Sequence, residues 1–551
     1  MNFFFTLNTI LIFINVEMVF SWKCGSDKLT ITPKPLKLTT HKNAKYSELT
    51  TSSYTPISIG YDFTTLQKPL SMSSYTFENV KSLLQETRIE FSKILQIRHK
   101  NINLTNYLED IIDTCEIYTI GENYPEFLIK NDIIIFPKFY SLDDGILASA
   151  APCLIDNNLR PIAGVLFINE ELNFDMTNTK YYMKNLLFHE ITHILAFHPF
   201  YFKHLNLSII SGSKSYINSP KALSKAREHF NCSSLSLIPL ENQGGSGSIG
   251  AHWESRYMLG DYMVSTDFPD STISDITLGL FEDTGFYKVN YYSGGLFKFG
   301  KNKGCSFFNK KCIENEKPNF EEFCNIKNEA KCSSSRTIKS SCYLIDYYAS
   351  LPKEYRYFSN PNRGGFFAAD YCPVPLEIYF ENDHFPNHCQ FGKSHLSEEY
   401  GENISKESLC FMSSLLPETS TKVNSLIPIC YSVECDLNTK NIIVKIGSKR
   451  IFCPSNGGII YNPSGFKGSI ECPKYNDICS SNNTTFICND MYNCFTEFAK
   501  RDKYNYKTTY YDYSGNTISL YDDYIDIIML NESFIKLNFT LIILYLFFFF
   551  N

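Results

Sequence analysis

The sequence lacks any long run of basic residues, and its formal net charge is −7 over 551 residues. This charge balance argues against nucleic acid as a partner. Histidine is scarce as well, with 11 residues in the whole chain, so two histidines at a short fixed spacing are informative. A hydrophobic content of 44% and a charged content of 20% exclude a disordered chain, and the length allows two or three globular domains.

Cysteine, in contrast, is abundant: the chain contains 19, and fifteen of them lie from Cys305 onward. Such a load indicates disulfides and therefore an oxidising compartment. Residues 1–21 form an apolar stretch of signal-peptide length, although the positive charge usual at its start is missing. We therefore expect a secreted or cell-surface protein, and glycosylation sequons are compatible with this expectation. Six of the sequons lie at Asn103, Asn206, Asn231, Asn403, Asn482 and Asn483.

Residues 22–55 are rich in Thr, Ser, Lys and Pro and show no core pattern, so we expect a removable segment there. After it the hydrophobic pattern becomes that of strands and an amphipathic helix. The expected elements are a strand at 57–61, a helix at 75–97 and strands at 132–136 and 161–168. Their order predicts a small mixed sheet that supports the next helix, as in an α+β catalytic domain.

That next helix, predicted over residues 178–197, contains the motif HExxH at His189, Glu190 and His193. The i, i+4 spacing places the two histidines on one helix face, where their ring nitrogens can bind one zinc ion. Glu190 lies beside the first histidine, within reach of a metal-bound water, and can act as a general base. Apolar neighbours bury this helix, and a metal ion supplies the partner that its buried polar groups need. The alternative is a structural pair of histidines.

A catalytic zinc ion needs a third protein ligand. The compact pattern HExxHxxGxxH is absent, because Ala196 and Pro199 stand where it requires Gly and His. Four downstream candidates remain: His204, His229, Glu228 and His252. Glu228 would give a site with a carboxylate ligand. His252 follows a glycine-rich run whose backbone can turn sharply toward a site, and Met263 lies further on, as in metzincins, which place a Met in a turn under three zinc-bound histidines.

Two further helices are expected in this region, at 219–230 with Ser219 as N-cap, and at 271–284 with Gly285 as its end. The cysteine-rich remainder, to about Cys494, has short strands and loops and predicts a disulfide-stapled domain. The chain ends on an apolar tail at 537–550, which at about fourteen residues is short for a transmembrane helix. Such a tail fits a GPI-attachment signal, with a short membrane span as the alternative.

Several stretches resemble leishmanolysin, a family of surface metzincin peptidases in which a long insertion separates the active-site helix from the third histidine. They are HEITH (189–193), SPKALSKAREHFNC (219–232), GSIGAHWESRYMLGDYM (247–263), LGLFEDTGFYKVNY (278–291) and GGFFAADYCPV (364–374). The resemblance implies a zinc endopeptidase with one Zn²⁺ per chain, bound by His189, His193 and His252. It also implies Glu190 as the base and Met263 in the Met-turn.

The same resemblance implies an inhibitory propeptide whose cysteine occupies the open position of the zinc ion. Cys24 and the following Asp27 match that segment, whereas Ser26 replaces the histidine of the family. Without Cys24 the remaining cysteines are even in number and could form nine disulfides. The alternative for Cys24 is an unpaired or intermolecular thiol.

The expected fold is therefore α+β: a metzincin-type catalytic domain, with a mixed sheet and a zinc-binding helix, followed by a disulfide-rich C-terminal domain of strands and loops. The expected parts are a signal peptide at 1–21, a propeptide-like segment at 22–55, catalytic subdomains at 56–198 and 199–300, the cysteine-rich domain at 301–500 and a tail with an anchor signal at 501–551. The expected function is a secreted or membrane-anchored zinc endopeptidase acting on proteins or peptides. The alternative is a catalytically silent adhesin or coat protein on the same fold.

Overall fold

The computed structural model describes residues 53–479, apart from short gaps, and four short segments outside that range. The gaps are 99–107, 118–130, 144, 172–175, 244–247, 267–270, 292–296, 378–387, 391–393, 395, 406, 423–424 and 437, and the outer segments are 23–24, 33–35, 509–511 and 517–519. The expected signal peptide, most of the propeptide-like segment, the apolar tail and the sequons at Asn103, Asn482 and Asn483 lie outside the described residues.

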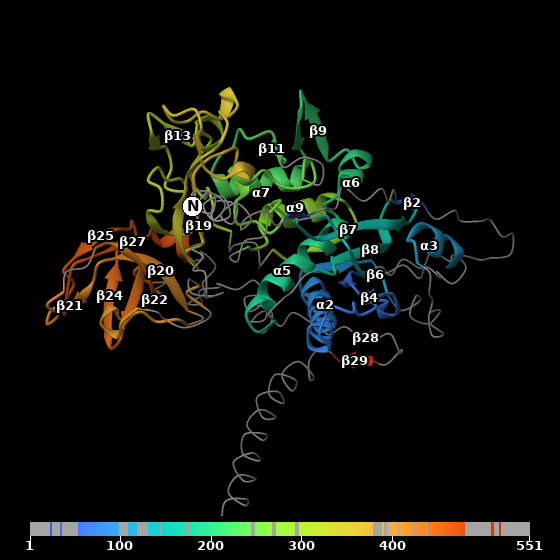
Figure 1. Cartoon of the computed structure of the whole chain (residues 1–551), viewed down its shortest axis with the longest axis horizontal. Coiled ribbons are helices and arrows are strands. Elements are labelled where there is room, and N and C mark those ends of the chain that lie inside the picture. Colours follow the sequence, from blue (N-terminus) through green and yellow to red (C-terminus); the bar gives the residue numbers. More distant parts are fainter. Residues whose placement is uncertain are drawn as a thin grey trace, which may run out of the picture.

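The first half of the chain contains a mixed sheet of six strands (Figure 1). Its strands are β1 (Lys23–Cys24), β2 (Lys34–Pro35), β4 (Ile59–Tyr61), β6 (Ile133–Tyr140), β7 (Ile146–Ile155) and β8 (Pro161–Asn169). Strands β4, β6 and β8 are mutually parallel, β7 is antiparallel to β8, and β1 and β2 both pair with β7. Because β7 and β8 are buried on both faces, β8 reads as a continuous apolar run. The predicted mixed sheet is confirmed, whereas β7 was not anticipated.

Helix α5 (Met176–Leu195), which carries HExxH, packs on this sheet. At Gly164 of β8, an added Cβ atom would lie 2.4 Å from Cγ2 of Ile194, so only glycine allows the helix to approach the strand this closely. Helix α2 (Ser74–Ile94) lies beside α5 (Figure 1). The rings of Phe91 and Phe188 stack with centroids 4.0 Å apart. The HExxH helix is therefore held by a strand and by a second helix.

The predicted helix at 75–97 was wrong at its end. Residues Leu95–Ile97 form strand β5, which pairs with β12 (Tyr287–Val289) and β3 (Thr55–Pro56) in a separate three-stranded sheet. The apolar residues of this stretch are compatible with a helix or a strand. It forms a strand because it pairs with β12, nearly two hundred residues further along the chain. A short helix, α3 (Leu108–Thr114), precedes β6.

The central part contains mainly short helices and a small sheet. Its elements are α6 (Pro199–His204), β9 (Ser208–Ser211), β10 (Lys214–Ile217), α7 (Pro220–Phe230), β11 (Ile238–Pro239), α8 (Ser255–Met258) and α9 (Asp275–Asp283). A short 3-10 helix, η2 (Phe63–Thr65), lies earlier in the chain, after β4. Ser219 is the N-cap residue of α7, as predicted, but its side chain makes no capping hydrogen bond. Asp283 accepts the backbone N–H of Lys221 and of Ala222 instead, at 2.9 Å each. Helix α9 starts later than predicted and ends before Gly285, whose φ is +76°.

The cysteine-rich part consists of short strands, short helices and a second six-stranded sheet in the order β24-β23-β22-β20-β27-β25. The elements are α10 (Ser306–Asn309), β13 (Ile313–Glu314), β14 (Lys317–Pro318), β15 (Ala330–Cys332), β16 (Lys339–Tyr343), β17 (Ile345–Asp346), η5 (Lys353–Tyr355), β18 (Arg363–Gly364), η6 (Phe367–Ala369), β19 (Val374–Glu377), η7 (Glu398–Tyr400), β20 (Ser408–Ser413), β21 (Leu416–Pro417), β22 (Ile427–Asp436), β23 (Asn441–Ile446), β24 (Lys449–Cys453), β25 (Gly458–Tyr461), β26 (Phe466–Lys467), β27 (Ser469–Cys472) and α11 (Tyr475–Ile478). Two further short strands, β28 (Thr509–Tyr511) and β29 (Thr517–Ser519), lie beyond this part and pair with each other.

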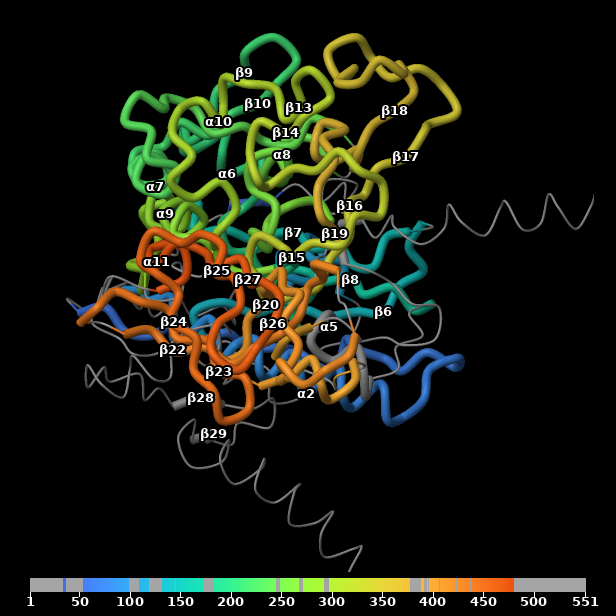
Figure 2. The backbone as a smooth tube through the Cα atoms, turned by 90° about the vertical axis from the view of Figure 1, so that its left-hand side faces the viewer, coloured from blue at the N-terminus to red at the C-terminus, as the bar shows by residue number. Residues whose placement is uncertain are grey.

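The two largest hydrophobic cores among the described residues underlie this arrangement. The larger core runs from Ile57 to Leu376, and a second core between Leu409 and Cys479 lies within the second sheet. Figures 1 and 2 both show the second sheet (orange) gathered apart from the yellow segment that precedes it. The boundaries expected from the sequence remain predictions.

Eight disulfides join sixteen of the cysteines. They are Cys115–Cys153, Cys232–Cys305, Cys312–Cys372, Cys324–Cys342, Cys332–Cys410, Cys389–Cys430, Cys435–Cys479 and Cys453–Cys472. The expected disulfide-rich character is confirmed. The ninth pair would need Cys488 and Cys494, which lie outside the described residues. In the described part of the chain, no helix combines the length and apolarity needed to span a bilayer.

Candidate metal centre

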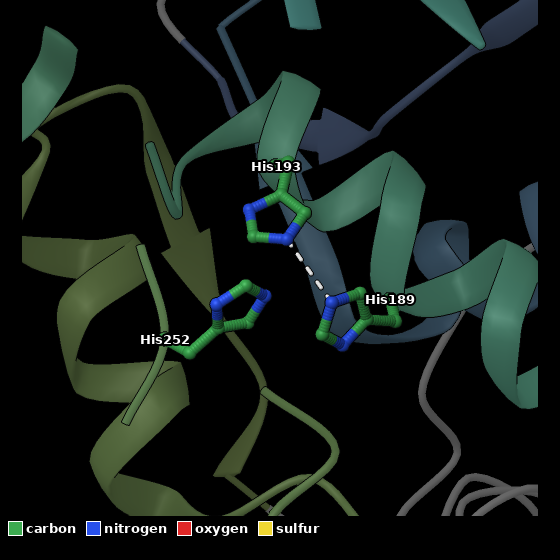
Figure 3. A group of neighbouring side chains, drawn as sticks. All are labelled: His189, His193 and His252. Carbon is green, nitrogen blue, oxygen red and sulfur yellow. Dashed lines mark hydrogen bonds between the residues drawn. The ribbon is translucent and has the colours of Figure 1, made fainter. Parts of the chain in front are cut away.

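Three histidines from two distant parts of the chain meet in the interior (Figure 3). His189 and His193 project from the same face of α5, and His252 comes from the loop after the glycine-rich run. One ring nitrogen from each lies within 4.8 Å of the other two. The exposed fractions are 8% for His189 and 0% for both His193 and His252. The structure thus brings together the three residues that the resemblance implied as ligands.

Each imidazole is oriented by a backbone carbonyl at its Nδ1 atom. Nδ1 of His189 donates to the carbonyl of Tyr262 at 2.5 Å, and Nδ1 of His193 donates to that of Phe197 at 2.6 Å. Nδ1 of His252 donates to the carbonyl of Ser248 at 3.1 Å. A carbonyl can only accept, so in the neutral rings the proton is on Nδ1 and the lone pair is on Nε2.

The three Nε2 atoms therefore form a set of lone pairs that fits a cation. Nε2 of His189 and Nε2 of His193 are 3.0 Å apart, and two unprotonated nitrogens this close repel each other unless a cation lies between them. Among the described residues, the buried Nε2 of His252 has no hydrogen-bond partner. Two nitrogens bound to one tetrahedral zinc ion lie roughly 3.3 Å apart, so this donor set fits zinc.

Burial also keeps these imidazoles neutral. It lowers the pKa of His189 to about 4 and that of His252 to about 3. The pKa of His193 is held well below its ordinary value, first by burial and then by the neighbouring His189 and His252. Neutral imidazole is the form that binds metal, so the site is competent without prior deprotonation at neutral pH.

Glu190, the expected base, is fully buried in α5 next to His189. Burying an ionised carboxylate costs free energy unless a polar or charged group interacts with it. The buried position of Glu190 therefore agrees with the functional role expected from the motif. Its function as a base remains a prediction.

Met263 occupies a tight turn next to this cluster. The turn spans Asp261 to Val264 and is closed by the N–H of Val264 donating to the carbonyl of Asp261 at 3.2 Å. The Asp261 carboxylate accepts the N–H of Met263 at 2.8 Å, and the carbonyl of Met263 accepts the N–H of Trp253 at 2.9 Å. Because Trp253 follows His252 directly, the turn and the loop carrying the third histidine are joined by backbone hydrogen bonds.

The end of α5 is also tied to the cluster. The chain leaves the helix after Leu195, and the carbonyl of Phe197 turns back to His193. Ala196 is not among the described non-glycine residues with positive φ, so alanine is accommodated where the family has glycine. His198 is the N-cap of α6 and accepts the N–H of Phe200 at Nδ1, which gives it a structural role.

The other candidate ligands lie elsewhere. His204 is exposed and bonds to the carbonyl of Phe200. Nε2 of His229 bonds to the carbonyl of Phe299, and Glu228 is an exposed partner of Lys225, 3.2 Å away. None of these three belongs to the metal-binding group found among the described residues.

Sequence reasoning missed the residues that orient the ligands. The carbonyls of Tyr262, Phe197 and Ser248 carry no signal, because every residue has a carbonyl. Asp261 offered a weak signal, because an Asp side chain often accepts the backbone N–H two residues further on, in an Asx-turn, as it does here with Met263. The side chain of Tyr262 packs on α5 with its ring 5.2 Å from that of Phe188.

A buried carboxylate lies behind the loop of His252. Glu241 is 1% exposed, and its oxygens accept the N–H of Gln243 at 2.7 Å and the hydroxyl of Ser265 at 3.3 Å. Burial, opposed by these hydrogen bonds, raises the pKa of Glu241 to about 8. The folded protein therefore binds this proton more tightly than the unfolded chain does, so the stabilisation is complete below the ordinary pKa and is lost as pH rises through the folded value.

We expect the melting temperature of the protein to fall between about pH 5 and about pH 8.5, and Glu241→Gln to make that fall shallower, because glutamine cannot ionise. Thermal unfolding followed by circular dichroism across this range measures the effect. Glu228→Gln, at an exposed carboxylate, is the control and should leave the slope unchanged. Parallel curves for the parent and Glu241→Gln would contradict the assignment.

Comparisons with known proteins give consistent matches. The family model described as leishmanolysin matches residues 79–485, more than half of the chain. A leishmanolysin homolog of Crithidia fasciculata is 28% identical over 386 residues, which are 66% of this chain and 57% of that protein. Leishmanolysin of Leishmania major is 26% identical over 393 residues, 67% of this chain and 63% of that protein. A leishmanolysin-like peptidase of Caenorhabditis briggsae is 31% identical over 306 residues, 48% and 45% respectively. The matches thus span less than two thirds of the length of these relatives.

Proposed function

The chain belongs to the leishmanolysin family, and on that premise we propose that it is a zinc-dependent endopeptidase that acts on proteins or peptides outside the cell. The observation that carries the proposal is the buried cluster of His189, His193 and His252, whose Nε2 lone pairs converge while every Nδ1 is held by a carbonyl. Three neutral histidines and an open position are the donor set of a catalytic zinc ion.

Each residue has a separate task in the proposed reaction. The three imidazoles hold the ion, which when bound polarises the scissile carbonyl and lowers the pKa of a water molecule. Glu190 takes the proton of the attacking water and passes it to the nitrogen of the leaving amine. The turn of Met263 is hydrogen-bonded to His189 and to the residue after His252, and this arrangement favours a metzincin layout of the catalytic part.

The amino-terminal segment is proposed as a removable propeptide with Cys24 as the inhibitory thiol. In support, β1 pairs with β7 so that Cys24 lies in register with Ala148, and β2 continues along the same strand. Residues 23–24 and 34–35 of the segment thus pair with a strand of the sheet on which α5 packs. A thiolate is a good zinc ligand, so it can compete with water for the open position.

The proposed location is the cell surface or the extracellular space. Eight disulfides support an oxidising compartment. The sequon residues Asn206, Asn231 and Asn403 are exposed, as glycosylation requires. Anchoring through the apolar tail, by a GPI group or a short span, is proposed from the sequence alone.

A cleavage assay tests the function. Protein freed of its amino-terminal segment is incubated with a peptide library, with and without a zinc chelator. We expect internal peptide bonds to be cut, the activity to disappear on chelation and to return when Zn²⁺ is added. Full zinc occupancy without hydrolysis of any peptide would contradict the proposal and favour a catalytically silent adhesin.

A further inference from the structure

Tyr262 joins the turn of Met263 to helix α5 through three separate contacts. Its carbonyl accepts Nδ1–H of His189 at 2.5 Å, its hydroxyl lies 2.9 Å from Oγ1 of Thr192, and its ring centroid is 5.2 Å from that of Phe188. The three partners belong to about one turn of helix α5. The side chain and the backbone of Tyr262 therefore both contact the part of the helix that carries His189.

The direction of the hydroxyl bond is determined by the geometry. Oγ1 of Thr192 donates its only proton to the carbonyl of Phe188 at 2.9 Å, so the Tyr262 hydroxyl must be the donor to Thr192. Tyr262 is 5% exposed and Thr192 is fully buried, so the bond between their hydroxyls lies in the interior. This hydrogen bond therefore attaches the side chain of Tyr262 to helix α5.

The helix and the turn that Tyr262 joins are each anchored independently. On the helix side, the ring of Phe188 also stacks on Phe91 of α2, 4.0 Å away. On the turn side, the Asp261 carboxylate accepts the N–H of Met263 and also bonds to Ser274 and Thr277 at the start of α9. Tyr262 thus links the turn to the helix, and the carbonyl that orients His189 belongs to the same residue.

We propose that Tyr262 is a positioning residue, whose side chain fixes its own carbonyl against α5 and thereby holds His189 in the orientation that binds zinc. This inference rests on the proposed function. If the hydroxyl bond is removed, the turn can shift relative to the helix and the Nδ1–H···O bond of His189 loosens. The expected consequence is weaker zinc binding, as for other residues that orient a metal-bound histidine.

The test compares Tyr262→Phe with Tyr287→Phe. Tyr287 is also buried, and its hydroxyl donates to the carbonyl of Leu195 at the end of the same helix at 3.1 Å, whereas its ring lies against those of Phe281 and Phe286. Both variants lose one buried hydroxyl bond to α5 and keep the aromatic ring, so both should fold. Zinc affinity is measured by competition with a chromogenic chelator, and the stability of the metal-free proteins by thermal unfolding.

We expect Tyr262→Phe to weaken zinc binding about 3- to 10-fold and Tyr287→Phe to change it by less than about 2-fold, with similar losses of metal-free stability. Thr192→Val removes the same bond from the helix side, so the double variant should bind zinc no more weakly than either single variant. Equal zinc affinities in the two tyrosine variants, or additive losses in the double variant, would overturn the positioning role alone. A parent protein that binds no zinc would overturn the proposed function together with this role.

Discussion

Replacing Glu190 with glutamine is expected to lower kcat for peptide hydrolysis by about 10²- to 10⁴-fold while zinc stays bound. Glutamine has nearly the same shape but cannot accept the proton of the attacking water. Glu190 is fully buried in α5, so bulk solvent has little access to replace it as a base. Because glutamine leaves the three imidazoles in place, KM should change much less than kcat.

The control for this prediction is Glu228→Gln. Glu228 is a carboxylate on α7 whose side chain is 72% exposed, and its removal should leave kcat unchanged. Initial rates on one fluorogenic peptide, normalised to bound zinc, give both values. A Glu190→Gln protein that holds zinc and cuts the peptide at the rate of the parent would rule out Glu190 as the base.

Replacing His252 with alanine is expected to weaken zinc binding by more than about 10²-fold and to abolish hydrolysis at micromolar zinc. The remaining pair on α5 offers only two nitrogens, and two ligands do not hold a catalytic zinc ion. His252 is buried, and its Nε2 lies with those of His189 and His193 (Figure 3). Zinc content after dialysis measures the loss.

His229→Ala is the matched control for that variant. His229 is another histidine downstream of HExxH, and its Nε2 bonds to the carbonyl of Phe299. Its removal should lower the melting temperature without releasing zinc, because the ring also packs against Phe230 and Phe297. Zinc loss in His229→Ala together with zinc retention in His252→Ala would contradict the assignment of the third ligand.

The HExxH half of the site was predictable because its geometry is local. A spacing of four residues places two side chains on one face of any helix, and apolar neighbours such as Phe188 and Ile191 indicated that the helix is buried. The third histidine was different. His204, His229, Glu228 and His252 remained open on the residues alone, because only the packing of α5 against the distant loop decides among them. The resemblance to a family selected His252, and the structure places it beside the other two.

The parts of the fold that escaped prediction depend on contacts between remote segments. Strand β7 contains small residues and Pro152, which are weak strand formers, and it is stabilised by pairing with β8 and by burial on both faces. Leu95–Ile97 became a strand because β12 pairs with it. The cap of α7 comes from Asp283 rather than from Ser219, and no local pattern could reveal a donor–acceptor pair more than sixty residues apart.

The decisive measurement on the three-histidine site is zinc K-edge X-ray absorption on protein freed of its amino-terminal segment. The arrangement of His189, His193 and His252 predicts one zinc ion per chain with three imidazole nitrogens at about 2.0–2.1 Å and one oxygen in the open position. A first shell with fewer than three imidazoles, or one dominated by sulfur at about 2.3 Å, would contradict it.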